Sequence, residues 1–264
     1  MPLRDLWVLS SDDELYSHIF GIPLISAYFF YLKRREIFQN VSYSISLGIV
    51  VLIVGSVLYM AGLSQGLRLT QNDYLSLMIF TAVLAWIGGF ILFYGIGSVK
   101  TNLFPFLFLL FMVPIPDVLV ARAISFLQIC STEASYGIFK LTGVPLLRDG
   151  FIFHLPGISI EVAKQCSGIR SSIALLITSI MAGQLFLKSA SRKIVLALVI
   201  IPITIFKNGL RIVTLSLLGV YVDQSILSSA LHKKGGIPFF FLSLIFMGFI
   251  LWLLRRSEKK SMKI

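Results

Sequence analysis

The chain has 264 residues, of which 57% are hydrophobic and only 13% are charged, and its mean hydropathy is +0.91. Soluble domains are much less apolar, so this composition excludes a water-soluble enzyme. The net charge of +11 raises the question of a nucleic-acid partner, which the placement of the charges along the chain has to answer.

Seven apolar windows follow in chain order, each close to or above the roughly 20 residues that a helix needs to cross the hydrocarbon core. Backbone groups in lipid must find their hydrogen bonds inside the segment, which predicts an all-α polytopic membrane protein with about seven transmembrane helices. Prolines interrupt the first window at Pro23 and the fourth at Pro114 and Pro116. The windows are Ile19–Leu32, Val41–Leu63, Leu75–Gly97, Leu103–Ala121, Ile169–Leu187, Ile194–Val220 and Ile237–Leu254.

One connection, residues 114–168, is much longer than the others. Its first part, Val118–Leu141, alternates apolar and polar residues with helical spacing, which predicts an amphipathic helix on the membrane surface or against the bundle. Two short apolar runs then flank Pro156 and Gly157, a pattern typical of a short β-hairpin. We therefore expect a single transmembrane domain over residues 1–264, with residues 114–168 as an insertion on the outer face.

The basic residues indicate the orientation, because Lys and Arg collect in short cytoplasmic loops. Twelve of the 23 fall in alternate connections and most acidic residues in the others, which predicts an outer N-terminus and a cytoplasmic C-terminus in a cell (inner) membrane. The excess charge then needs no nucleic-acid partner. The first 14 residues contain no apolar core of a cleavable signal peptide. The twelve are Lys33, Arg34, Arg35, Lys100, Lys188, Arg192, Lys193, Arg255, Arg256, Lys259, Lys260 and Lys263.

Cys166 directly precedes the fifth window. Exposed N–H groups and the positive end of a helix favour a thiolate there, Lys164 and Arg170 strengthen the field, and Ser167 is placed to cap the helix. Alternatively, Cys166 is a buried thiol that only fills space. Two cysteines are too few for a disulfide scaffold, and the second, Cys130, either pairs with Cys166 or, as we prefer, is a buried thiol on the amphipathic helix.

A second polar group lies within the sixth window, where Lys207, Asn208 and Arg211 share one helix face. Arg211 is 18 residues beyond Lys193, which places it about 27 Å along the helix, near the outer interface. Charges at such depth are functional more often than not, although snorkelling to the headgroups is the simpler explanation.

His232 lies in the last outer connection. The predicted topology brings Cys166, Arg211 and His232 to the same face, where a thiolate, a guanidinium and an imidazole together suit acyl transfer. His18 and His154 also reach that face, so the residue types alone leave the choice of histidine open.

These residues resemble the exosortase/archaeosortase family of membrane transpeptidases that process C-terminal sorting signals. Glu161 to Arg170 is similar to the family's Cys-Ser-Gly segment, Asn208 to Arg211 to its Asn-x-x-Arg, and His232 to Gly236 to its His-x-x-x-Gly. Met112 to Pro116 looks like the Pro-rich segment before the family's outer region. The resemblance covers nearly the whole chain, with Lys207 as a departure where an apolar residue is expected.

The resemblance implies that Cys166 is the nucleophile, Arg211 the oxyanion or thiolate partner and His232 the general acid and base, although some archaeal relatives use a second Arg in place of the His. Asn208, Ser167, Arg170, Glu161 and Gly236 belong to the same motifs as supporting residues. The implied reaction is attack on a peptide carbonyl beside a substrate's C-terminal membrane helix through a thioester. Substrates would be membrane-anchored proteins with a C-terminal motif, a helix and a basic tail, and no cofactor or metal is implied.

Three other functions remain open. A non-enzymatic transporter or anion-binding membrane protein would use Lys207 and Arg211 to hold a carboxylate or phosphate. An enzyme acting on a lipid-linked phosphate would use the same cations without the thiol. A scaffold would need none of the three site residues.

Overall fold

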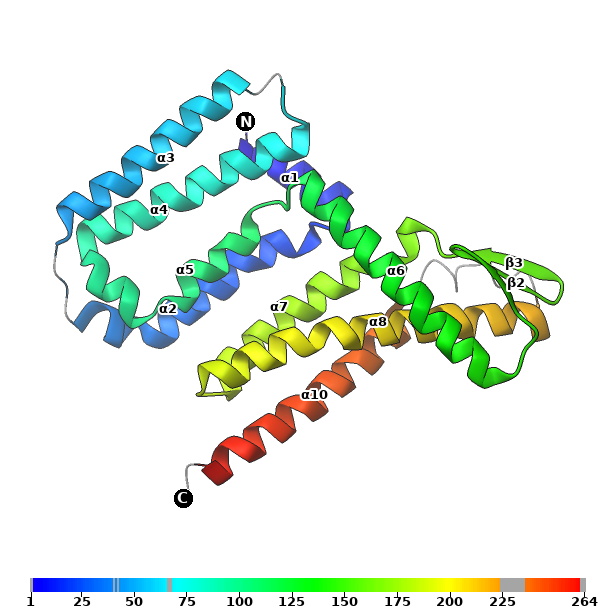
Figure 1. Cartoon of the computed structure of the whole chain (residues 1–264). Helices are drawn as coiled ribbons and strands as arrows, with labels where there is room; N and C mark the ends of the chain where they lie inside the picture. The colour runs from blue at the N-terminus through cyan, green and yellow to red at the C-terminus, as the bar shows by residue number, and fades with distance from the viewer. Residues whose placement is uncertain (1, 40, 42, 66–67, 224–235, 262–264) are drawn as a thin grey trace. The chain divides into compact units, whose positions relative to one another are not determined.

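The computed structural model describes residues 2–39, 41, 43–65, 68–223 and 236–261. The chain divides into two compact units, residues 1–120 and residues 121–264 (Figure 1). Helices dominate both units, as the all-α prediction expects.

The first unit is a set of packed helices: α1 (Pro2–Asp12), the 3-10 turn η1 (Ser17–Phe20), α2 (Gly21–Gln39), α3 (Ile45–Gln65), α4 (Gln71–Thr101), α5 (Phe104–Phe108) and η2 (Leu109–Met112). The long helices α3 and α4 pack antiparallel, with Gly48 against the backbone of Leu92 and Gly62 against Met78. A methyl group on Gly48 would come within 2.7 Å of the Leu92 Cα, so the glycine permits this close approach.

The Pro-rich turn of the first unit interrupts the fourth predicted window. Ser76 Oγ donates to the Pro114 carbonyl at 2.7 Å, and Asn72 Nδ2 donates to the Ile115 carbonyl at 2.8 Å. These bonds hold a chain that the prolines prevent from being helical. The chain therefore bends by 91° at this break, between the helical segments Phe104–Met112 and Asp117–Thr142.

Among the described residues, five helices are long and apolar enough to cross a membrane, or six if the bent pair counts as one span. This confirms a polytopic helical membrane protein but differs from the seven spans expected. The first predicted window forms α2, which also contains the charged residues 33–36, and the fourth is broken at the prolines.

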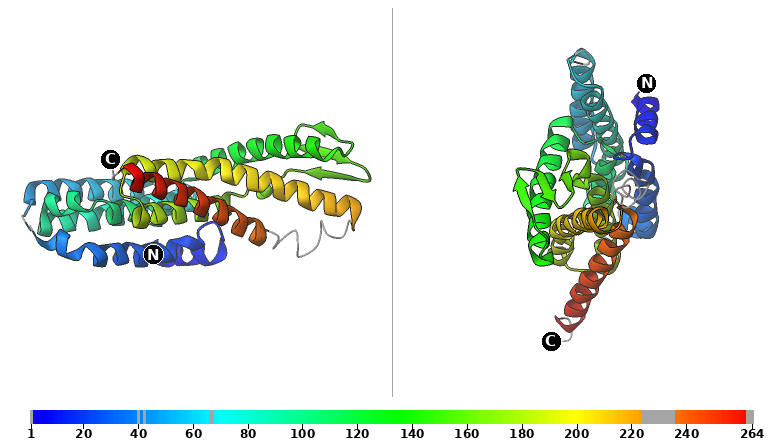
Figure 2. Two further views of the ribbon diagram at one scale, coloured as in Figure 1. Left: turned by 90° about the horizontal axis from the view of Figure 1, so that it is seen from below. Right: turned by 90° about the vertical axis from the view of Figure 1, so that its right-hand side faces the viewer.

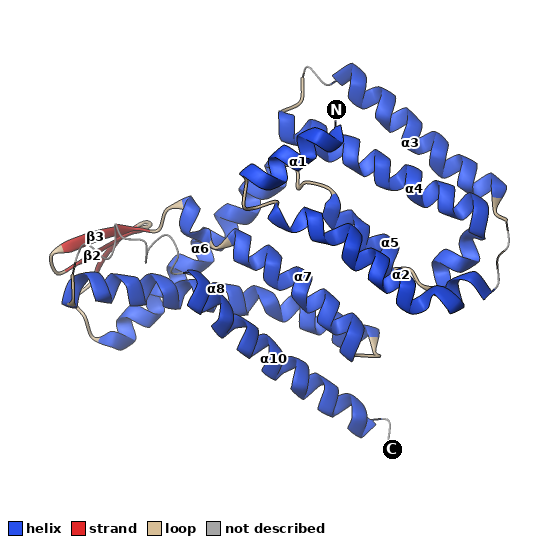
Figure 3. Cartoon of the chain, turned by 180° about the vertical axis from the view of Figure 1, so that it is seen from behind, coloured by secondary structure: helices blue, strands red, loops and turns tan. Residues whose placement is uncertain are grey.

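The second unit begins within α6 (Asp117–Thr142), close to the predicted helix at 118–141, and continues into a small sheet. Strands β2 (Ile152–Leu155) and β3 (Ile158–Glu161) form the hairpin about Pro156 and Gly157. Strand β1 (Leu147–Asp149), which the sequence analysis did not predict, pairs antiparallel with β2 (Figure 3). Phe139 of α6, Phe153 of the sheet and Val213 bury one apolar cluster between helix and sheet.

Among the described residues of the second unit, three long helices follow the sheet: α7 (Ile169–Phe186), α8 (Ala190–Tyr221) and α10 (Gly236–Ser261). They pack against one another (Figure 2) around a cluster that includes Leu175, Leu196 and Met247. The buried Glu258 near the end of α10 accepts hydrogen bonds from the backbone N–H groups of Lys188 and Ser189 at 3.0 and 2.7 Å. The end of α10 is thus fixed to the α7–α8 connection.

Candidate active site

Cys166 lies in a single 3-10 turn, η3 (Lys164–Ser167), just before α7. The turn ends at Gly168, whose φ of 76° lies in the left-handed region that favours glycine, and Gly168 is the N-cap of α7. The prediction that Ser167 caps this helix is therefore wrong: the N-cap makes no side-chain hydrogen bond, and the Ser167 side chain is wholly buried. Cys166 is partly buried, and its backbone N–H donates to the Ala163 carbonyl at 2.8 Å.

Asn208 of α8 holds this turn. Its Nδ2 donates to the Cys166 carbonyl at 2.7 Å and to Ser131 Oγ of α6 at 3.0 Å, and the side chain is completely buried. One amide therefore joins α6, the turn before α7, and α8. The sequence analysis identified Asn208 as a supporting residue but did not identify Ser131.

A small cavity brings the predicted nucleophile and the predicted guanidinium together. Cys166, Arg211 and Glu161 line it, with Ser216 and four apolar residues of the β3 region and α8, which are Ile160, Val162, Ile212 and Leu215. Its volume of about 40 Å³ has room for a few water molecules, which is the scale of a carbonyl group rather than of a peptide. Attack on a carbonyl beside Arg211 is the chemistry that such a lining permits.

Lys207 and Arg211 of α8 have different surroundings. Arg211 lines the cavity, whereas Lys207, only 5% exposed, donates through Nζ to Ser171 Oγ of α7 and is not among the lining residues. Sharing a helix face thus does not place both cations at one ligand site.

The remaining predicted site residues lie around this centre or outside the described residues. Arg170 is the exposed second residue of α7, and Gly236 is the first residue of α10. His232 falls outside the described residues, so its role stays a prediction. Of the other histidines, His154 Nδ1 lies 2.8 Å from Ser159 Oγ in the hairpin, and neither it nor His18 of the first unit lines the cavity. Burial lowers the pKa of His18 below its ordinary value.

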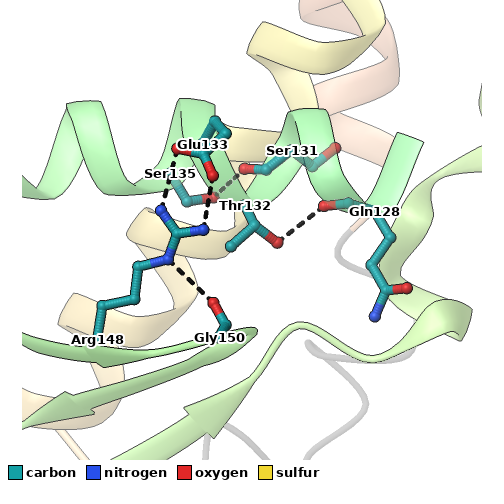
Figure 4. Close-up of polar contacts among 7 residues, drawn as sticks. All are labelled: Gln128, Ser131, Thr132, Glu133, Ser135, Arg148 and Gly150. Carbon is teal, nitrogen blue, oxygen red and sulfur yellow. Dashed lines mark hydrogen bonds and ion pairs between the residues drawn. The ribbon is translucent and has the colours of Figure 1, made fainter. Parts of the chain in front are cut away.

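Polar side chains of α6 make hydrogen bonds near the site, and Figure 4 shows Gln128, Ser131, Thr132 and Ser135 along this helix. Gln128 Nε2 donates to the Val162 carbonyl at 2.7 Å, and the hydroxyls of Thr132 and Ser135 donate to carbonyls one turn earlier in α6. These residues are buried, and sequence reasoning missed them. The sequence does indicate this buried polar face, because these polar residues are spaced three and four apart and so lie on one side of the helix.

A charged pair joins β1 to the same helix. The guanidinium of Arg148 donates to both carboxylate oxygens of Glu133, at 2.6 and 3.0 Å, and its Nε donates to the Gly150 carbonyl (Figure 4).

Both cysteines are free thiols, so the structure favours the alternative in which Cys130 is not paired with Cys166.

A family model described as transmembrane exosortase matches residues 7–249 of the chain. No curated protein and no solved structure matches the chain. The matched region includes η3, the polar face of α8 and the whole of the cavity lining.

Proposed function

The chain belongs to the transmembrane exosortase family, which supports a general role in transpeptidation and protein sorting at a membrane, and from this premise we propose that it cleaves C-terminal sorting signals with Cys166 as nucleophile. The observation that carries the proposal is the single cavity that Cys166 and Arg211 both line. In the proposed reaction the thiolate attacks a peptide carbonyl in this cavity, and the guanidinium of Arg211 stabilises the oxyanion that forms.

Collapse of that intermediate breaks the C–N bond, and the leaving amine takes a proton from a general acid, for which His232 is the proposed residue. The product is a thioester on Cys166. Attack by water, or by an amine or hydroxyl acceptor, then transfers the acyl group and restores the thiol. Asn208 supports the chemistry indirectly, because it holds the carbonyl of the residue that carries the sulfur.

We place this reaction at the outer face of a cell (inner) membrane, with the N-terminus outside and the C-terminus cytoplasmic. Cys166 precedes α7, while the opposite end of α7 meets the basic segment at residues 188–193. Glu258 binds the backbone of that segment, so the basic end of α10 lies with it, as the positive-inside rule expects for one cytoplasmic face. Reporter fusions at the C-terminus and after residue 150 test this orientation, and equal signals from both would contradict it.

The proposed substrates are membrane-anchored proteins with a C-terminal motif, a membrane helix and a basic tail. A scissile bond beside such a helix lies at the interface, which is the level of a nucleophile that directly precedes a membrane helix. The anion-binding alternative has less support, because Lys207 is directed to Ser171 and, of these two cations, Arg211 alone lines the cavity.

The test is Cys166→Ala in cells that also produce a tagged candidate substrate from the same genome, with Cys130→Ala as the matched control. We expect Cys166→Ala to leave the substrate at full length on an immunoblot and Cys130→Ala to process it normally, because Cys166 lines the cavity and Cys130 does not. Full processing by Cys166→Ala would contradict the proposed function. A hydroxylamine-sensitive adduct between the unmodified protein and its substrate would identify the thioester.

A further inference from the structure

Lys207 is a buried cation whose surroundings the proposed mechanism does not use. It is 5% exposed inside a membrane helix, where an ammonium group is costly and its position needs an explanation. Its Nζ donates to Ser171 Oγ, and Ser171 Oγ in turn donates to the Gly168 carbonyl at 2.9 Å. Ser171 therefore links Lys207 through two hydrogen bonds to Gly168, the glycine at which the Cys166 turn ends.

Lys207 and Asn208, which are neighbours in α8, hold the turn that carries Cys166 at two points. Asn208 binds the carbonyl of Cys166, and Lys207 acts through Ser171 on the carbonyl of Gly168. A methyl group on Gly168 would lie 3.2 Å from Asn208 Oδ1 and 3.6 Å from Lys207 Nζ, so both side chains pack directly against the left-handed residue.

We propose that Lys207 is a positioning residue for Cys166: with Ser171 as relay, it fixes the Gly168 turn and keeps a positive charge beside the segment that presents the thiol. This inference rests on the proposed function for its catalytic meaning. It does not make Ser171 a nucleophile, because the Ser171 hydroxyl donates to the Gly168 carbonyl and Lys207 acts as donor to Ser171.

The chain provides matched controls for each part of this proposal. Ser172 Oγ also donates to the Gly168 carbonyl, at 2.8 Å, and is not the residue that Lys207 contacts. Lys193 of α8 makes a similar lysine contact with α7, to Gln184 Oε1 at 2.7 Å, at the other end of the helix pair. Cys130 on α6 is an internal reference thiol in the same molecule.

The experiment measures the rate at which N-ethylmaleimide alkylates Cys166 and Cys130 in purified full-length protein without substrate, by mass spectrometry. We expect Lys207→Met to slow alkylation of Cys166 roughly tenfold and to leave Cys130 unchanged, because a nearby cation favours the reactive thiolate. Lys207→Arg should restore most of the rate, since it keeps the charge and a donor. Lys193→Met should have no effect on either thiol.

The relay itself is tested by combining substitutions. If Lys207 acts through Ser171, Ser171→Ala should reproduce most of the effect, because it removes the hydroxyl that holds the Lys207 ammonium and the Gly168 carbonyl in place. The double variant should then be no slower than about twofold beyond Lys207→Met alone. Ser172→Ala should instead add to Lys207→Met independently. An unchanged or faster reaction of Cys166 in both Lys207→Met and Ser171→Ala would overturn the proposal.

Two outcomes separate this proposal from the proposed function and from simple unfolding. If Lys207→Met accelerates the alkylation of both thiols, that variant has unfolded. The rate of Cys166 alkylation in Ser171→Ala then tests the proposal: a slower rate supports it, and an unchanged or faster rate overturns it. If the alkylation rates change as expected while Cys166→Ala still processes substrate, the proposed function fails and the positioning role stands.

Discussion

The N-termini of α7 and α8 occupy the same kind of position, at opposite ends of one antiparallel helix pair, yet the protein completes them differently. At the start of α8, Glu258 supplies a carboxylate that accepts from the N–H groups of Lys188 and Ser189. At the start of α7, Gly168 is the N-cap and Cys166 lies in the preceding turn. Neither N-cap residue, Gly168 of α7 or Ser189 of α8, makes a side-chain cap hydrogen bond, so the difference lies in the carboxylate of Glu258. A helix N-terminus attracts negative charge in both cases.

The difference separates a structural end from a candidate reactive end. An anion built into the protein neutralises the α8 terminus and ties α10 to it. In the part of the chain that the structure describes, no carboxylate accepts from the backbone N–H groups at the start of α7; Lys207 packs against Gly168 and Arg211 lines the cavity with Cys166, which suits a thiolate or an oxyanion formed during the proposed reaction. Substitutions at the two ends should therefore separate activity from stability.

The largest effect is expected at Gly168. Gly168→Ala forces a side chain into a left-handed conformation that costs about 1–2 kcal/mol and crowds Asn208 Oδ1 at 3.2 Å. We expect substrate processing to fall by roughly 100-fold or more, because small displacements of a catalytic group are costly. Gly137→Ala, in an open position on α6, is the control and should process normally. Normal processing by Gly168→Ala would mean that the turn does not position the nucleophile.

A smaller loss is expected at Asn208. Asn208→Ala removes the donor to the Cys166 carbonyl and leaves Ser131 without this contact, so processing should fall by roughly 10-fold to 100-fold. Initial rates of substrate cleavage in membranes measure the effect. Ser131→Ala, which keeps the bond to Cys166, should lose less; an equal loss in both variants would assign the role of Asn208 to helix packing.

At the structural end the change should affect stability alone. Glu258→Gln weakens the hydrogen bonds to the α7–α8 connection and the contact with Arg192 at 3.3 Å, and should lower the free energy of unfolding by about 1–3 kcal/mol. Thermal unfolding in detergent measures this, while alkylation of Cys166 should not change. Glu36→Gln, which disrupts an exposed ion pair with Lys33, is the control and should cost less than about 1 kcal/mol. A Glu258→Gln variant of full stability but low activity would reverse the assignment of the two ends.

The smallest effect is expected away from both ends, at the pair that joins β1 to α6. Arg148→Lys loses the two-point contact with Glu133 but keeps the charge, and should lower stability by about 0.5–1 kcal/mol because Glu133 is largely exposed. Thermal unfolding again provides the measurement, with unchanged processing as the expected companion. A large loss of processing would show that the sheet position matters for the cavity.

Much of the architecture followed from local patterns. The amphipathic helix predicted at 118–141 is α6, and the hairpin at Pro156 and Gly157 is β2–β3. Cys166 and Arg211, which were expected at one face of the membrane, line one cavity. Hydrophobic length and turn residues carry such information because they depend on neighbours along the chain. Pro114 and Pro116 indicated the break in the fourth window, but the hydrogen bonds that hold the turn were not predictable, since their donors Asn72 and Ser76 are on another helix.

The sequence by itself determined that this is a helical membrane protein, where its apolar segments lie, and which motif residues are candidates for the site. Only the tertiary structure decided that Gly168 rather than Ser167 caps α7, that Ser131 and Asn208 meet over the Cys166 carbonyl, and that Lys207 faces Ser171 while Arg211 faces the cavity. The physical reason is the same in each case. Apolar length and helical spacing are properties of a continuous segment, whereas the partner of a buried polar group is chosen by whichever helix packs against it.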